Sequence, residues 1–121
     1  MQKLMPQEVE VWYLLPSLRR ELAKILIKDY SLTQKEVAKI FGLTESAVSQ
    51  YVKLKRANDL KFSKKELDSI KKYASKINKS PEKYQKYLFQ LSLEMRGTES
   101  MCKLHKKFDP SLKKGCDLCR K

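Results

Sequence analysis

The chain has 121 residues, enough for one domain or one domain with a small appendage. It carries 27 lysines and arginines against 14 aspartates and glutamates, and a formal net charge of +13 attracts polyanions, most commonly nucleic acid. A hydrophobic fraction of 41% argues against global disorder, and no segment has the ~20 apolar residues that span a membrane. A lysine-rich surface without a polyanionic partner is the alternative explanation of the charge.

The N-terminal segment PQEVEVWYLL fits either a short extra helix or an extended arm. Its apolar part follows acidic residues and is too short for a secretory signal, so a cytoplasmic protein is expected. Trp12 and Tyr13 are expected in the core or at a dimer interface.

Apolar residues recur at helical spacing almost throughout, and no run alternates as a strand would, which predicts an all-α fold of five helices. The first of them is predicted to run from Pro16–Ser17 to Asp29. Its apolar face consists of Leu18, Leu22, Ile25 and Leu26.

The stretch QKEVAKIFGLTESAVSQYVK, residues 34–53, contains two short helical patterns joined by Gly42. Glycine adopts a positive φ at little cost, and Thr44 is a suitable N-cap for the second helix. Leu43 is expected to fill the space beneath the turn. The pattern is that of a helix-turn-helix, in which the second helix enters the major groove of DNA. The inner residues predicted for the two helices are Val37, Ala38, Phe41, Ala47, Val48 and Tyr51.

The outer face of the second helix is short and polar, as base reading requires. Gln50 can pair with adenine through two hydrogen bonds, and Glu45 can accept one from cytosine. Ser46 and Ser49 can donate or accept. The following KLKR, with Lys53, Lys55 and Arg56, is suited to phosphate contacts. A helix pair that touches no nucleic acid is the alternative.

Two more helices are predicted beyond this motif. Ser63 and Glu66 form a capping-box pattern before an apolar stripe, and Ser80–Pro81 restarts a helix that stops at Gly97. Because one recognition helix contacts few base pairs, residues 63–96 are candidate dimerisation helices of a homodimer, or they complete a monomeric core. Their expected inner residues are Leu67, Ile70, Ala74, Ile77, Tyr84, Tyr87, Leu88, Leu91 and Met95; Phe89, like the tyrosines, is expected to pack rather than to stack on bases.

The tail, residues 98–121, contains a C-x-x-H pair and a C-x-x-C pair with ten residues between them. Three thiolates and one imidazole at this spacing predict a closed structural zinc site. An iron–sulfur cluster, a reversible Cys116–Cys119 disulfide and an unstructured basic tail are the alternatives. The predicted metal ligands are Cys102, His105, Cys116 and Cys119.

The stretch SLTQKEVAKIFGLTESAVSQYVK resembles the phage-repressor/Cro type of helix-turn-helix, and the longer LPSLRRELAKILIKDYSLTQKEVAKIFGLTESAVSQYV resembles a family of small archaeal transcriptional regulators. The family pattern has a Cys-x-x-Cys pair where this chain has Gln90 and Leu93. The resemblance implies that Gln34 touches phosphate or base, and that the major groove is faced by Thr44, Glu45, Ser46 and Gln50.

These observations predict a helical DNA-binding domain, residues 1–97, with a helix-turn-helix at 34–55, and a metal-binding tail, residues 98–121. The predicted function is a sequence-specific double-stranded DNA-binding transcriptional regulator. No phosphate loop or catalytic elbow is present, so an enzyme is not expected. An RNA- or ribosome-associated protein, a protein-interaction adaptor and a regulator that senses redox state through the tail are the alternatives.

Overall fold

The computed structural model describes residues 5–53, 62–96 and 98 of the chain. Over these residues the protein is all-α, as predicted, and contains no strand. The predicted five helices correspond to α2 through α6. In chain order the elements are α1 (Pro6–Val9), a π-helical turn η1 (Glu10–Leu14), α2 (Leu15–Tyr30), α3 (Gln34–Phe41), α4 (Glu45–Val52), α5 (Lys64–Lys79), a 3₁₀ turn η2 (Pro81–Lys83) and α6 (Tyr84–Met95).

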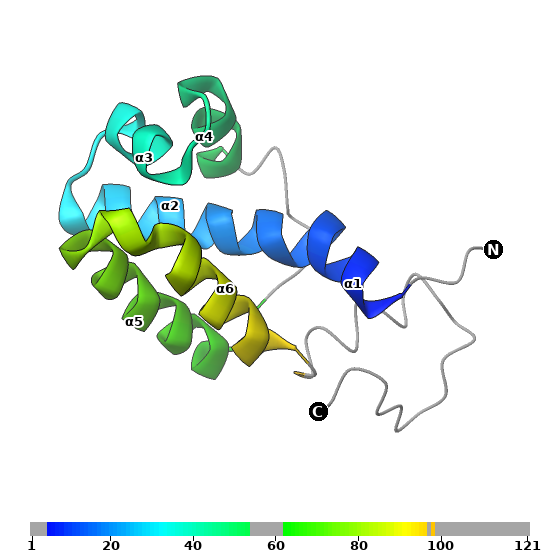
Figure 1. Ribbon diagram of the computed structural model, residues 1–121. Helices are drawn as coiled ribbons and strands as arrows, with labels where there is room; N and C mark the ends of the chain where they lie inside the picture. Colours follow the sequence, from blue (N-terminus) through cyan, green and yellow to red (C-terminus); the bar gives the residue numbers. More distant parts are fainter. Residues whose placement is uncertain (1–4, 54–61, 97, 99–121) are drawn as a thin grey trace.

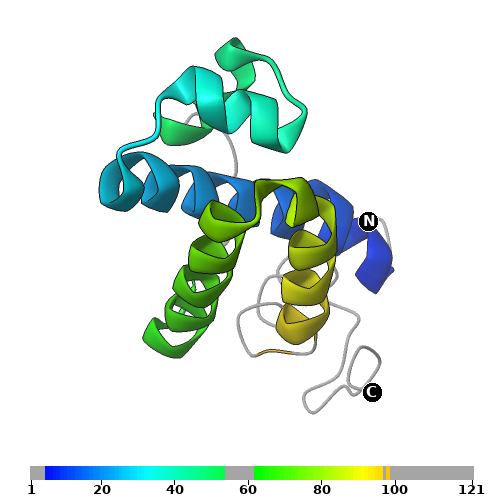
Figure 2. The same ribbon diagram turned by 60° about the vertical axis from the view of Figure 1, so that its left-hand side comes forward.

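Helix α2 is the centre of the fold. The pair α3 and α4 lies on one side of it, and α5 and α6 descend side by side on the other (Figures 1 and 2). Both pairs pack their apolar faces against α2, so one core joins them. Its fully buried side chains include Leu14, Leu18, Leu22, Leu26, Val37, Val48, Ile70, Ile77 and Leu91.

The N-terminal segment is helical and leads through η1 into α2, which decides between the helix and the extended arm. Trp12 is 51% exposed, so the expectation that it lies in the core is wrong, while Leu14 is fully buried. Residues two positions apart on a helix point to nearly opposite sides, so burying Leu14 turns Trp12 outward. Tyr13, between them, is half-buried.

Helix α5 begins as predicted. The Ser63 hydroxyl accepts a hydrogen bond from the Glu66 backbone N–H (3.2 Å), and the Glu66 carboxylate accepts one from the Ser63 N–H (2.8 Å). The apolar stripe is buried at Ile70, Ala74 and Ile77, whereas Leu67 is half-buried because it lies in the first turn.

The start of α6 differs from the prediction. The Ser80 side chain makes no capping hydrogen bond, and a 3₁₀ turn separates it from Tyr84, the first residue of α6. The Ser80 backbone N–H instead donates to the Lys76 carbonyl and closes α5. Phe89 is 63% exposed and does not pack as expected, because it follows the buried Leu88 and so points away from the buried side of α6. Tyr84 and Leu88 are buried and Tyr87 is half-buried.

Candidate nucleic-acid interface

The first helix of the motif, α3, starts with a complete capping box. The Thr33 hydroxyl accepts from the Glu36 backbone N–H (3.1 Å), and the Thr33 N–H donates to the Glu36 carboxylate (3.0 Å). The Thr33 backbone N–H, and then its side chain, hold the pKa of Glu36 below its usual value. The box holds Gln34 at the first residue of α3, where its side chain is half-buried.

The turn between α3 and α4 depends on Gly42, as predicted. Its φ of 66° lies in the left-handed region, and its N–H donates to the Ala38 and Lys39 carbonyls. The Leu43 N–H also donates to the Ala38 carbonyl (2.9 Å), which closes the end of α3 with backbone bonds. A Cβ built at Gly42 meets nothing within 4 Å, so only the backbone angle favours glycine here.

Helix α4 begins at a threonine cap. The Thr44 hydroxyl accepts from the Ala47 backbone N–H (3.0 Å), which satisfies one free donor of the first turn. Thr44, Glu45 and Ser46 are all exposed, so the N-terminal end of α4 presents a free polar surface. This is the end of a recognition helix that contacts base edges in DNA complexes of this motif.

The C-terminal half of α4 is less open than predicted. Ser49 and Gln50 are half-buried rather than exposed, and Ala47 is half-buried rather than buried. The reason is that α4 has only eight residues and packs across α2 through Val48 and Tyr51, so side chains beside these anchors are partly covered. Gln50 nevertheless retains solvent access.

Three exposed lysines flank this surface. Lys53, predicted to hold phosphate, follows α4 and is exposed. Lys35 and Lys39 are also exposed, and they lie one turn apart on α3, the helix that spans the DNA backbone in this motif. The sequence prediction assigned no role to Lys35 and Lys39, although their four-residue spacing already puts them on one side of α3.

A polar cluster lies where the motif packs on the rest of the fold. It contains Arg19 of α2, Tyr51 of α4 and Tyr84 of α6. Burial acts to lower the pKa of Arg19, but the neighbouring Tyr84 and Tyr51 side chains outweigh it and the pKa is raised. Burial also raises the pKa of the Tyr84 hydroxyl, against the opposing effect of Arg19. Apolar spacing in the sequence indicated Tyr51 and Tyr84 only as packing residues and gave no signal for Arg19.

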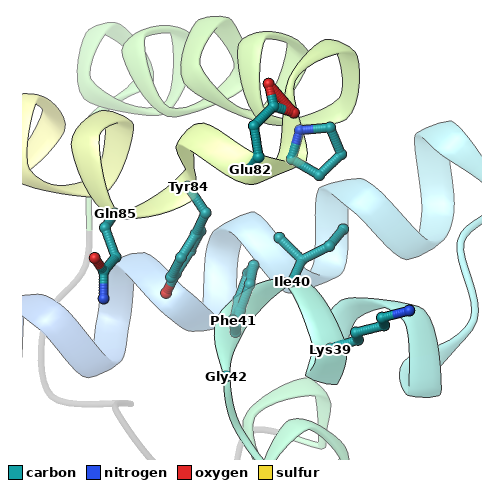
Figure 3. A pocket seen from close by; sticks show the side chains of 8 residues that line it. Lys39, Ile40, Phe41, Gly42, Glu82, Tyr84 and Gln85 are labelled. Carbon is teal, nitrogen blue, oxygen red and sulfur yellow. The ribbon is translucent and has the colours of Figure 1, made fainter.

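Beneath the Gly42 turn is an open hollow of about 490 Å³, lined by residues from the end of α3 and from the η2–α6 junction. Figure 3 shows the Phe41 and Tyr84 rings side by side, with Lys39 and Glu82 on either side of the hollow. The two rings are stacked with centroids 4.5 Å apart. This stack joins the helix-turn-helix to α6.

Several predicted site residues lie outside the described residues. Lys55 and Arg56 fall in 54–61, and the four predicted metal ligands, Cys102, His105, Cys116 and Cys119, fall in 99–121. Their predicted roles therefore stay predictions.

Helices α2, α3 and α4, with Gly42 at the turn and an exposed polar end on α4, form the helix-turn-helix region of the protein. Residues 17–54 match the winged helix-turn-helix DNA-binding family. The match spans most of α2 and all of α3 and α4, and it implies DNA binding by a regulator rather than an enzyme. No wing hairpin occurs in the described part of the chain, which has no strand.

Neither the curated proteins nor the solved structures contain a match. None of the described helices is long and apolar enough to cross a membrane.

Proposed function

We propose that this protein is a transcriptional regulator that binds specific sequences of double-stranded DNA through α4. The observation that carries the proposal is the free polar end of α4, formed by Thr44, Glu45 and Ser46 and held outward by the Gly42 turn. The winged helix-turn-helix match over residues 17–54 supports it, as does the net charge of +13.

Base reading is assigned to the outer side of α4. The amide of Gln50 presents a donor and an acceptor together, which fits the edge of adenine. Glu45 accepts from cytosine, and the hydroxyls of Ser46 and Ser49 adapt to either partner. Thr44 lies at the groove entrance, since its hydroxyl already caps α4.

Phosphate contacts are assigned to residues at both ends of the motif. Gln34 stands at the start of α3, and Lys53 follows α4, with Lys55 and Arg56 beyond it. The exposed Lys35 and Lys39 add positive charge along α3. Contacts of this kind fix the register on DNA and make binding fall steeply with salt through counterion release.

The decisive experiment compares Gln50→Ala with Gln7→Ala, which removes an exposed amide from α1. An operator is first selected from random duplexes with the wild-type chain. Gln50→Ala should then cost about 1–3 kcal/mol on the operator and relax the preference at one base pair, while Gln7→Ala changes neither. Equal losses on operator and random DNA, or equal competition by duplex RNA, would contradict base reading by α4.

The phosphate contacts are tested by salt titration. Lys53→Ala should weaken binding to all duplexes alike and reduce the slope of log affinity against log salt by about 0.9. Lys65→Ala is the matched control, because Lys65 is exposed on α5 across α2 from the motif. A slope that is unchanged in Lys53→Ala, or reduced as much in Lys65→Ala, would remove Lys53 from the interface.

We further propose that the protein binds as a homodimer. On α6, the side chains of Phe89 and Leu93 lie one turn apart and are 63% and 42% exposed, which supports the assignment of residues 63–96 to dimerisation. A two-fold dimer would recognise half-sites about one turn of DNA apart. In sedimentation equilibrium, Leu93→Lys should shift the chain to a monomer; a wild-type chain that is monomeric at all concentrations would refute the dimer.

The tail is proposed to hold one structural zinc ion through Cys102, His105, Cys116 and Cys119. The proposal rests on their spacing in the sequence, because thiolate and imidazole ligands in two short pairs suit a tetrahedral site. Elemental analysis of anaerobically purified protein should find one zinc per chain. If iron and an absorption band at ~400 nm are found instead, the tail binds an iron–sulfur cluster and not zinc. If the chain contains no metal, the Cys116–Cys119 disulfide or the unstructured basic tail is the remaining explanation.

A further inference from the structure

Helix α5 presents a strongly cationic face to solvent. Its apolar stripe, with Ile70, Ala74 and Ile77, is buried in the core. The helix is therefore divided into an apolar side that folds the protein and a charged side that is free for contacts. The exposed residues of α5 are five lysines, which we call the α5 lysine face, and one aspartate: Lys64, Lys65, Lys71, Lys72, Lys79 and Asp68.

The lysines of this face form two rows along the helix. Lys65, Lys72 and Lys79 recur at seven-residue steps, and Lys64 and Lys71 form a second row beside them. Residues seven apart lie nearly on one line of a helix, because seven residues make almost two turns. At a rise of ~1.5 Å per residue the longer row spans about 21 Å, over which duplex DNA presents about twelve phosphate charges.

Positive charge is denser on α5 than on the helix-turn-helix. Residues 64–79 contain six lysines against two acidic residues, a net charge of +4, whereas residues 34–53 contain three lysines against two glutamates, a net charge of +1. Lys72 Nζ lies 5.6 Å from the Tyr73 ring centroid, a contact that leaves its charge in place. The surface that attracts polyanions therefore extends to a helix outside the DNA-binding motif.

The α5 lysine face is turned away from the α4 surface. Helix α5 packs on α2 from the side opposite to α3 and α4 (Figures 1 and 2). Its lysines point away from the buried stripe and hence away from α2. A duplex held by α4 in its major groove does not reach them, so substitutions on α5 leave the salt dependence of operator binding unchanged.

The composition of the face indicates its partner. None of the exposed residues of α5 is apolar or aromatic. The face therefore offers no anchor to a protein or a lipid interior, and no ring on which the bases of single-stranded nucleic acid could stack. Lysine ammonium groups are point charges that bind phosphate without reading sequence. Straight rows of them fit the regular backbone of a double helix.

We propose that the α5 lysine face binds the phosphate backbone of a second segment of duplex DNA, so that one chain bridges two segments. Helix α4 holds the operator, and α5 holds neighbouring DNA without sequence preference. Binding at α4 raises the local concentration of DNA at α5, so weak contacts suffice there. Bridging rests on the proposed function of α4, whereas the attraction of α5 for duplex DNA does not.

A capture assay tests bridging. The selected operator, cut to a single site, is fixed to beads and saturated with the full chain, and a fluorescent duplex of unrelated sequence is added at low salt. The wild-type chain should retain this second duplex. Lys65→Gln/Lys72→Gln should lower its retention about tenfold or more, because two phosphate contacts are lost, and should leave retention of the chain by the operator unchanged.

The matched control removes two charges outside α5. Lys83 and Lys86 are exposed on η2 and α6, and Lys83→Gln/Lys86→Gln lowers the net charge by the same amount. It should change retention of the second duplex by less than about twofold. Asp68→Asn acts in the opposite direction, because it removes the exposed carboxylate of the face, and should raise retention about twofold.

Three results would overturn the proposal: no second duplex retained by the wild type, equal losses in the two double variants, or stronger retention of duplex RNA than of duplex DNA. Retention that is unchanged in Lys65→Gln/Lys72→Gln would also overturn it, since α4 of a second copy would then hold the second duplex.

Failure of α4 has a separate readout. If the operator beads do not retain the wild-type chain, the proposed function fails, and α5 is tested alone by backbone amide NMR with a short duplex of unrelated sequence. Shifts of residues 64–79 that are lost in Lys65→Gln/Lys72→Gln would leave the α5 lysine face standing without bridging. Absence of these shifts at low salt would refute the face itself.

Discussion

Two of the helix junctions in the described residues, α3–α4 and α5–α6, connect their helices in different ways. Between α3 and α4, Gly42 reverses the chain in a left-handed conformation and Thr44 starts the next helix at once. Between α5 and α6, φ is negative at every residue, and Ser80 and the 3₁₀ turn η2 connect the helices. Both junctions contain local backbone hydrogen bonds, but a side-chain cap from Thr44 starts α4, whereas no side-chain cap starts α6.

The comparison shows how the α3–α4 pair keeps a polar surface exposed for binding, while the α5–α6 pair is held together by contacts between its two helices. Helices α3 and α4 have eight residues each, and α4 leaves its polar end exposed. Helices α5 and α6 pack along each other, with the Tyr73 hydroxyl donating to the Glu94 carboxylate and Lys76 Nζ lying 5.8 Å from the Tyr87 ring centroid. We expect the first pair to respond to backbone changes and the second to side-chain changes.

The largest effect should come from α2, which both pairs share. Leu22→Ala removes a fully buried side chain and should lower the free energy of unfolding by about 2–5 kcal/mol. Urea denaturation followed by circular dichroism measures it, with Val11→Ala, at a side chain that is 58% exposed, as control. If hydrogen exchange shows that Leu22→Ala loosens only one helix pair, the two pairs do not share one core.

The junctions themselves are compared by Gly42→Ala and Ser80→Ala. Alanine at a φ of 66° should cost about 1–2 kcal/mol of stability from backbone strain alone, because a Cβ there meets no neighbour. Ser80→Ala should change stability by less than about 0.5 kcal/mol, since its hydroxyl caps nothing. The loss of stability in Gly42→Asn should lie between those of Gly42→Ala and Ser80→Ala, because asparagine tolerates a positive φ better than alanine does. Equal effects of Gly42→Ala and Ser80→Ala would contradict the contrast between the junctions.

Alkaline pH should weaken the α5–α6 pair. Burial, and then the bond to Glu94, raise the pKa of Tyr73 to about 12 from its ordinary value of 10. A raised pKa means that the folded state holds the proton more tightly, so this contribution is complete below pH 10 and is lost as the pH rises through 12. The difference in stability between wild type and Tyr73→Phe should therefore shrink over that interval, measured by urea denaturation at each pH.

Acid pH should weaken the start of α3, by a smaller amount because Glu36 is exposed. Its pKa is lowered from 4.5 by the Thr33 backbone N–H and side chain, so the contribution is present above that value and is lost as the pH falls through the lowered pKa. Glu36→Gln should remove this acid dependence. If the stability of Glu36→Gln falls in acid as much as that of the wild type, other carboxylates cause the loss of stability.

Local features of the fold were predictable because neighbouring residues produce them. The capping residue Ser63, the Gly42 turn, the Thr44 cap and the positions of α2 through α5 all depend on short-range hydrogen bonds and apolar spacing. Predictions that needed the partner of a side chain were weaker. Trp12 and Phe89 read as core residues by hydrophobicity, yet both are more than half exposed.

On the candidate DNA-binding surface, too, features set by one helix were predictable and features set by packing between helices were not. Periodicity was enough to predict that Val48 and Tyr51 face inward, but the partial burial of Ser49 and Gln50 depends on how α4 crosses α2. Spacing along α3 could have indicated Lys35 and Lys39, since both lie on one side of a single helix.

By itself, the sequence determined the all-α class, the break at Gly42 and the polar character of α4, because helix periodicity, caps and a positive φ are properties of adjacent residues. Only the tertiary structure decided that Arg19, Tyr51 and Tyr84 meet. These three residues come from α2, α4 and α6, and no periodicity within one helix specifies which side chains of separate helices face each other.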